Sequence, residues 1–355
     1  MKKIKLNRDY LITYGMVILF YIIMTILKGT GSLTSLFSGL LVPICVYSIL
    51  AVSLNLTVGI LGELSLGHAG FMCVGAFSSA FFSMCMKDVI TNSFVRFLIA
   101  LLISALVAAF FGIIIGIPVL RLRGDYLAIV TLAFGEIIKN IVNILYVGRD
   151  LDGMHISIKD SISLGLKDDG KVIINGAQGI TGTPHDSNFT IGIILLLITL
   201  FVVLNFMHSR SGRAVMAIRD NRIAAESIGI NISKYKLMAF SISAALAGIA
   251  GCLYAHNLST LNALPKNFGY NMSIMILVYV VLGGIGNIRG SIIAATILTV
   301  LPELLRGFSD YRMLIYSVVL IALMLFNASP GAIEFKEKYS IKRLLSKKTK
   351  TKEVQ

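Results

Sequence analysis

The sequence predicts an all-α, polytopic integral membrane protein, and three observations lead to this fold class. Of the 355 residues, 56% are hydrophobic and only 14% are charged, whereas soluble domains carry about 25% charged residues. The hydrophobic residues form continuous runs close to the ~20 residues that a helix needs to cross a bilayer. These runs do not alternate apolar and polar residues as the strands of a membrane barrel do. Within a bilayer their backbone amides and carbonyls must be hydrogen-bonded, so the runs are predicted to be helices.

About ten runs have the length of a transmembrane helix. The first follows a basic N-terminus and has no small-residue cleavage site after it, so we expect an uncleaved span rather than a signal peptide. Glycines lie at the seam between the second and third runs and at the seam between the eighth and ninth. The expected number of membrane-spanning helices is therefore eight to ten. The predicted spans are 11–27, 40–58, 64–86, 94–117, 126–147, 189–207, 237–256, 272–287, 290–305 and 311–327.

The distribution of charge predicts the orientation. If the N-terminus is cytoplasmic and ten spans alternate, most of the 32 lysines and arginines fall in cytoplasmic segments, as positively charged loops usually do. The long loop 148–188, with six aspartates and four basic residues, then lies outside. We therefore expect a transmembrane domain over 1–335, both termini in the cytoplasm, and a basic tail, 336–355, near anionic lipid. A nucleic-acid partner is not expected, because no folded basic domain exists.

The segment 208–236 is basic and lies between two apolar runs. Its residues 212–229 predict a short amphipathic helix, because Val215, Ile218, Ala225 and Ile228 recur at helical spacing. Gly229 fits the position after a helix end. Two interpretations remain open from the pattern: a helix lying on lipid headgroups, or a docking segment for a cytoplasmic partner.

Motifs for chemistry are missing from the sequence. There is no G-x-x-x-x-G-K-[ST] phosphate-binding motif. The cluster "GGIGNIRG" (283–290) follows a hydrophobic span rather than a β-strand, which argues against a dinucleotide site. The cysteines and histidines show no metal-ligand spacing. We therefore expect no catalytic residues, no metal and no cofactor in this chain.

Polar residues inside spans are costly and are candidates for a substrate path. Two of them, Glu63 and His68, can instead satisfy an interrupted helix, and Glu136 can pair with Lys139 or with a partner subunit. Glycines in the later spans are predicted to permit close helix packing or a helix break. The path candidates are Asn55, Glu63, Ser65, His68 and Glu136, and the packing or break positions are Gly248, Gly251, Gly283, Gly284, Gly286 and Gly290.

Several segments resemble the permeases of the branched-chain amino acid ABC transport system, in the order found in that family. The similarity runs over most of 40–330 and is closest to the longer of the family's two permease partners. The stretch 149–175 is acidic, looks inserted and departs from the family pattern. The matching segments include "LNLTVGILGELSLGHAGFMCVGAF" (54–77), "RLRGDYLAIVTLAFGEIIKNI" (121–141), "GAQGITGTP" (176–184), "GRAVMAIRDNRIAAESIGINISKYKLMAFSISAALAGIAGCLYA" (212–255), "VVLGGIGNIRGSIIAA" (280–295) and "LPELLR" (301–306).

The resemblance implies an importer subunit in a bacterial cytoplasmic membrane that translocates branched-chain amino acids inward. It implies a second permease, two ATPase subunits that bind ATP and Mg, and an extracytoplasmic substrate-binding protein. It also implies that 208–236 is the loop that couples to the ATPase, through Gly212, Arg213, Arg219, Asn221, Arg222, Ala224, Ala225, Glu226 and Gly229.

Other functions remain open from the sequence. A permease of the same family for urea, short amides, nucleosides or a sugar is one. A self-sufficient channel or secondary transporter is another; inverted repeats would favour it, but it would leave the docking loop unexplained.

The predicted topology can be tested with single cysteines. A cysteine placed in 150–186 should react with a membrane-impermeant thiol reagent added outside intact cells, whereas one placed in 210–234 or 336–352 should not. Labelling of both groups from the same side would rule out the ten-span arrangement. The background protein must lack the native Cys45, Cys73, Cys85 and Cys252.

Overall fold

The computed structural model describes residues 8–122, 125–150, 152–167, 170–305 and 311–328. Within these ranges, seven helices are long and apolar enough to cross a membrane by length and composition. They are α1 (Arg8–Gly29), α2 (Ser35–Asn55, extended by a π-helical turn), α3 (His68–Cys85), α4 (Ser93–Val119), α5 (Asp125–Ile144), α6 (Phe189–His208) and α9 (Ile232–Ala255).

Three shorter apolar helices correspond to the last three predicted spans. They are α11 (Tyr270–Gly283), α12 (Ile288–Leu304) and α13 (Arg312–Ala328). The all-α membrane fold is thus confirmed, with a helix number close to the expected ten. The chain divides into two compact units, Met1–Thr299 and Val300–Gln355. The expected boundary at 335 and the basic tail 336–355 lie outside the described residues.

Helix α9 packs closely against α3 and α4 because small residues line the contact. A Cβ on Gly251 would overlap the backbone of Met72 in α3, and one on Gly248 would overlap Ala108 and the carbonyl of Ser104 in α4. The Ser104 hydroxyl donates to the Gly248 carbonyl at 2.5 Å. Close backbone approach through small residues is how helices associate in lipid, where no hydrophobic force drives them together.

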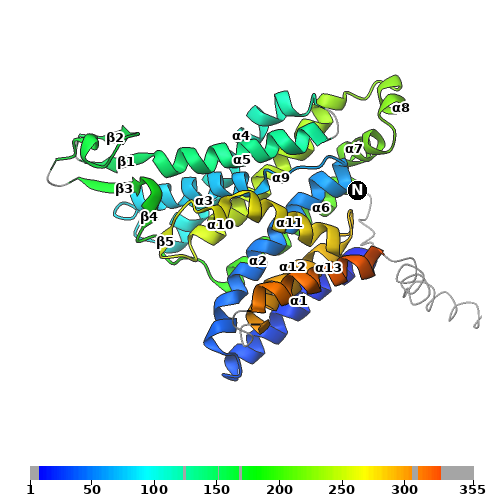
Figure 1. The fold of residues 1–355 in the computed structure, drawn as a ribbon, viewed down its shortest axis with the longest axis horizontal. Coiled ribbons are helices and arrows are strands. Elements are labelled where there is room, and N and C mark those ends of the chain that lie inside the picture. The colour runs from blue at the N-terminus through cyan, green and yellow to red at the C-terminus, as the bar shows by residue number, and fades with distance from the viewer. Residues whose placement is uncertain (1–7, 123–124, 151, 168–169, 306–310, 329–355) are drawn as a thin grey trace, which may run out of the picture. The chain divides into compact units, whose positions relative to one another are not determined.

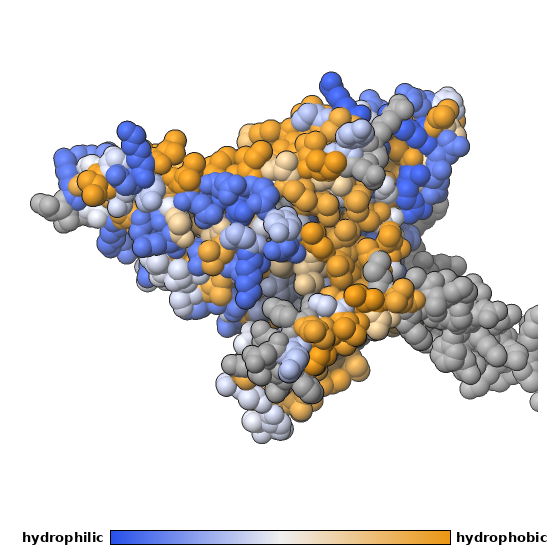
Figure 2. All heavy atoms as spheres, in the orientation of Figure 1, coloured by the Kyte–Doolittle hydropathy of each residue, from blue (hydrophilic) through white to orange (hydrophobic). Residues whose placement is uncertain are grey.

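Polar elements gather at the two ends of the first unit (Figure 1). One end, here called the loop end, carries α7 (Arg210–Asp220) and α8 (Arg222–Ser227). The other, the sheet end, carries two small sheets. Figure 2 shows hydrophilic residues around both ends and hydrophobic residues between them. The strands and short helices of the sheet end are β1 (Tyr146–Arg149), β2 (Met154–Ser157), η2 (Ile162–Leu164), β3 (Lys171–Asn175), η3 (Gly176–Gln178), β4 (Ile180–Thr181), β5 (Thr260–Leu261) and α10 (Pro265–Phe268).

The loop 148–188 contains β-strands that were not predicted. Strands β2, β1 and β3 form an antiparallel sheet in that order, and β4 pairs with β5. In the β1–β2 turn, the Asp150 carboxylate accepts hydrogen bonds from the amides of Asp152 and Gly153, both at 3.0 Å. Burial raises the pKa of Asp150, but these amide bonds and the nearby His155 outweigh it and hold the pKa below its ordinary value. The strands are too short to show periodicity in the sequence.

Both predicted seams are real interruptions of helix. Helix α2 continues into a π-helical turn, η1 (Leu56–Leu61), which ends at Gly62 with φ +78°. The chain then runs without helix to His68, where α3 begins, four residues later than the predicted span. At the second seam, Gly284 and Gly286 have φ values of +93° and +81° between α11 and α12. A positive φ cannot be part of an α-helix, and glycine adopts it more readily than residues with a Cβ. The chain therefore breaks between α11 and α12 at these two glycines.

Candidate functional site: a junction of two broken helices and the loop end

Two helices, α3 and α11, begin inside the bundle beside the middle of α5 rather than at its ends. The amide of Leu66, just before α3, donates to the Thr131 hydroxyl of α5 at 3.0 Å. Gly70 in the first turn of α3 faces Gly135 of α5, where an added Cβ would overlap backbone. The first residue of α11, Tyr270, donates its amide to the Glu136 carboxylate at 2.7 Å.

In each of these two helices, α3 and α11, here called the broken helices, a side chain from another helix accepts one amide of the first turn. The Ala69 amide of α3 donates to the Ser273 hydroxyl of α11 at 3.2 Å, and Glu136 accepts from α11 as described. The first four amides of a helix have no partner within it, and unpaired amides are costly within a bilayer. The junction of α3, α5 and α11 therefore holds two helix starts at membrane depth.

Glu136 also forms an ion pair with Lys139, one turn further along α5. The Lys139 side chain is 8% exposed, while that of Glu136 is 25% exposed. The two carboxylate oxygens thus have different partners: one caps α11 and the other neutralises a buried ammonium group. The predicted pairing of Glu136 with Lys139 is present.

The surface around Glu136 is polar, whereas the exposed face of α4 is apolar. We define the α5–α11 face as Glu136, Asn140, Tyr270 and Asn271; the last three are exposed. The exposed face of α4 is apolar along its length, with Leu98, Leu102, Leu106, Phe110, Ile113 and Ile117. Polar groups at membrane depth face protein or an aqueous path rather than hydrocarbon, so the α5–α11 face requires such a cover.

Three of the predicted path residues are enclosed. Asn55 donates to the Ser291 hydroxyl and accepts from the Gly286 amide, both at 2.8 Å. His68 shares a 2.7 Å hydrogen bond with the Ser53 hydroxyl. Ser65 is buried, and its hydroxyl has no hydrogen-bond partner among the described residues. Asn55 thus joins the end of α2 to α12 and the α11–α12 turn, and His68 joins α3 to α2. Among the path candidates, Glu136 lies on the exposed polar α5–α11 face.

Glu63 lies at the loop end, away from Glu136. It forms an ion pair with Lys236 in the first turns of α9. Together with Arg219 and Arg222, these two residues line a small, partly open pocket. The sequence did not indicate Lys236 as a partner, because 173 residues separate it from Glu63.

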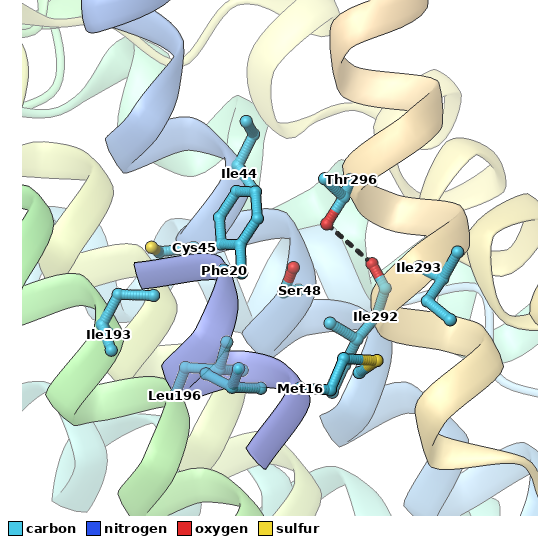
Figure 3. A pocket seen from close by; sticks show the side chains of 11 residues that line it. Met16, Phe20, Ile44, Cys45, Ser48, Ile193, Leu196, Ile292, Ile293 and Thr296 are labelled. Carbon is cyan, nitrogen blue, oxygen red and sulfur yellow. Dashed lines mark hydrogen bonds between the residues drawn. The ribbon is translucent and has the colours of Figure 1, made fainter. Parts of the chain in front are cut away.

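An apolar, partly open pocket lies among α1, α2, α6 and α12 (Figure 3). Its hydroxyl groups belong to Ser48 and Thr296, and the latter donates to the Ile292 carbonyl at 2.9 Å. A molecule with charged ends needs stronger partners than these, so this pocket does not fit one. In the described part of the chain, no group of three or more histidine, cysteine or acidic side chains could hold a metal ion.

The loop 208–236 forms two helices rather than the single helix expected over 212–229. The Ser209 hydroxyl caps α7 by accepting from the Gly212 amide, and the Asn221 side chain caps α8 by accepting from the Ala224 amide, both at 3.0 Å. Asn221 has an extended backbone, which separates the helices. Asparagine favours such cap positions, so the break follows from local chemistry that the apolar spacing concealed. Gly229, with φ +82°, follows the end of α8, as predicted for this glycine.

The loop residues divide into an inward and an outward set. Val215, Ile218 and Ala225 are buried, whereas Ile223 and Ile228 are 80% and 75% exposed. Arg213 donates to the His208 carbonyl at 2.9 Å, and Arg222 is half-buried. The outward set therefore presents two isoleucines beside the exposed Ala224 and Glu226.

Comparison with known proteins shows the family of the chain. The family described as "Branched-chain amino acid transport system / permease component" matches residues 36–328, most of the chain. The chain belongs to this family. No solved structure matches it.

Individual members of the family are also similar to this permease. It is 34% identical over 293 residues to the high-affinity branched-chain amino acid transport system permease protein LivM of Salmonella typhimurium, and 35% identical to LivM of Escherichia coli K12. Each alignment covers 79% of this chain and 66% of the relative, just under two thirds of its length. The permease protein LivH of Salmonella typhimurium is 23% identical over 286 residues, covering 79% of this chain and 88% of that protein.

The Glu136–Lys139 pair leads to a stability prediction for the permease. Glu136→Gln keeps an acceptor for the Tyr270 amide but leaves the buried Lys139 ammonium unpaired, which should destabilise the protein by about 3–5 kcal/mol. Adding Lys139→Met should restore most of the loss, because the unpaired charge is then gone. Thermal unfolding in detergent measures both. A double variant no more stable than Glu136→Gln would contradict the role of the ion pair.

Proposed function

We propose that this protein is the membrane-spanning permease subunit of an ABC importer that moves branched-chain, aliphatic amino acids into the cell. The observation that carries the proposal is the family match over 36–328. The LivM relatives, named as high-affinity branched-chain amino acid permeases, support the substrate class. The protein would lie in a bacterial cytoplasmic membrane as a multi-pass subunit with both termini in the cytoplasm.

The surfaces of the chain support the proposed partners. A second permease would cover the α5–α11 face, whose polar groups cannot remain against lipid. Two ATPase subunits, which bind ATP and Mg, would complete the importer, and one of them would dock on the outward set at α8. An extracytoplasmic substrate-binding protein would deliver ligand at the sheet end. The existence of LivM and LivH as separate permease proteins supports a heterodimeric pore.

A path along the α5–α11 face suits an aliphatic amino acid. The exposed Ile137 and Ile141 of α5 offer apolar contact for the side chain, while Glu136, Asn140 and Asn271 offer polar contact for the charged ends. ATP drives the transport only if the ATPases bind it with different affinity in the two states of the permease. The loop end would transmit that difference.

The substrate class can be tested by uptake in cells that lack their own branched-chain transport. Expression of this chain with its partner subunits should restore ATP-dependent uptake of labelled leucine, and unlabelled isoleucine or valine should compete. Urea, a nucleoside or a sugar should not. Uptake that persists when the ATPases are inactivated by mutation would indicate a channel or secondary transporter instead.

The docking role of α8 can be tested with one exposed isoleucine. Ile223→Asp should reduce co-purification of the ATPase about tenfold or more, because burying an isoleucine contributes about 1.5–3 kcal/mol. The matched control is Ile156→Asp, which changes a 69% exposed isoleucine at the sheet end and should leave ATPase recovery unchanged. Equal recovery in both variants would favour a helix that merely lies on the lipid surface.

A further inference from the structure

Arg219, near the end of α7, points back toward the membrane-spanning helices. Its Nη1 group donates to the Gly59 carbonyl in the π-helical turn η1 at 2.8 Å. Its Nε and Nη2 groups donate to one oxygen of Asp220 at 3.0 and 2.9 Å. The guanidinium thus joins a residue of the loop end to the backbone of η1, the extension of α2, while 39% of the side chain stays exposed.

The π-helical turn accommodates Arg219 through glycine. A Cβ on Gly62 would overlap the Cγ of Arg219, and Gly62 also has the left-handed φ that ends η1. In a π-helix the hydrogen bonds run from i to i+5, and such turns are rare and frequent at functional sites. A bond from a charged donor to a backbone carbonyl is about twice as strong as a neutral one, so Arg219 is a firm link to this turn.

The same turn is tied by side chains to two other membrane-spanning segments. Asn55, at its start, accepts from the Gly286 amide in the α11–α12 turn and is fully buried. A Cβ on Gly59 would overlap both Asn55 and the Gly286 backbone. Thr57 donates to the Ser243 hydroxyl of α9 at 2.8 Å. A displacement of η1 therefore acts on α9 and on the α11–α12 turn together.

From η1 the chain leads directly to the broken-helix junction. Five residues after Gly62, the non-helical segment reaches Gly67 and then α3, whose first turn contacts Ser273 of α11 and, through Leu66, Thr131 of α5. Glu136 caps α11 at the same junction. A continuous series of contacts thus connects α7 with the α5–α11 face.

We infer that Arg219 is the positioning residue that couples movement of the loop end to the π-helical turn and, through 62–67, to the broken-helix junction. This inference rests on the proposed function. In this inference the π-helical turn changes arrangement by exchanging one i→i+5 bond for an i→i+4 bond, which rotates the following residues by about 100°. Arg219 biases that exchange from the loop end without itself contacting substrate.

The test compares Arg219→Gln with wild type in the assembled complex reconstituted in lipid. We expect the ATPases to co-purify normally, because the outward set is intact, while the ratio of substrate transported to ATP hydrolysed falls about tenfold. A purely structural defect would lower both rates together and leave the ratio unchanged. Arg219→Lys, which keeps a charged donor, should recover a large part of the ratio. The matched control is Arg210→Gln, an exposed arginine in the first turn of α7, with a ratio within twofold of wild type.

A double-mutant cycle with Gly62→Ala tests the path itself. As a single variant, Gly62→Ala should lower the ratio of substrate transported to ATP hydrolysed, because it strains the left-handed turn and displaces the Arg219 side chain. In the Arg219→Gln background it should lower that ratio little further. A normal ratio in Arg219→Gln overturns the inference and leaves the proposed function standing. Loss of ATPase co-purification in this variant has the same consequence, because it would make Arg219 a docking residue. A wild-type complex without substrate-stimulated ATP hydrolysis overturns the proposed function and the inference with it.

Discussion

The structure depends on one constraint: every backbone amide within a bilayer needs a hydrogen-bond partner. Helices that cross the whole membrane meet this constraint by themselves, except at their ends. In this protein α3 and α11 begin at membrane depth, and their first amides would be orphaned there. Ser273 of α11 accepts the Ala69 amide of α3, and Glu136 of α5 accepts the Tyr270 amide of α11. The start of α3 therefore depends on α11, and the start of α11 depends on α5.

This dependence accounts for a charged pair in the middle of an apolar bundle. Glu136 caps α11, and Lys139 neutralises its charge from one turn away. The cost of burying two charges is offset by hydrogen bonds that hydrocarbon cannot replace. The result is a polar face at membrane depth, which an apolar helix such as α4 does not have. Such a face is suited to a path between subunits.

The loop end is attached to this junction rather than merely appended to the bundle. Its inward residues, Val215, Ile218 and Ala225, are buried, and Arg219 and Lys236 bind the backbone and side chains where α2 gives way to 62–67. Its outward residues Ile223 and Ile228 remain exposed. A segment that is anchored on one side and apolar on the other is well arranged to pass movement from a partner to the membrane-spanning helices.

The sequence by itself determined the membrane-spanning, all-helical class and the approximate positions of the spans. It also determined both glycine seams and the family, because all of these follow from local composition and from motifs along the chain. It also indicated the Glu136–Lys139 pair, since the two residues lie one helical turn apart. Tertiary structure alone decided the pairs that join distant segments: Glu63 with Lys236, Arg219 with Gly59, and Glu136 with the start of α11. It also decided that Asn55 and His68 are enclosed by bonding to Ser291 and Ser53. The physical reason is that a buried polar side chain is defined by its partner in space, and neither periodicity nor composition records which distant residue that partner is.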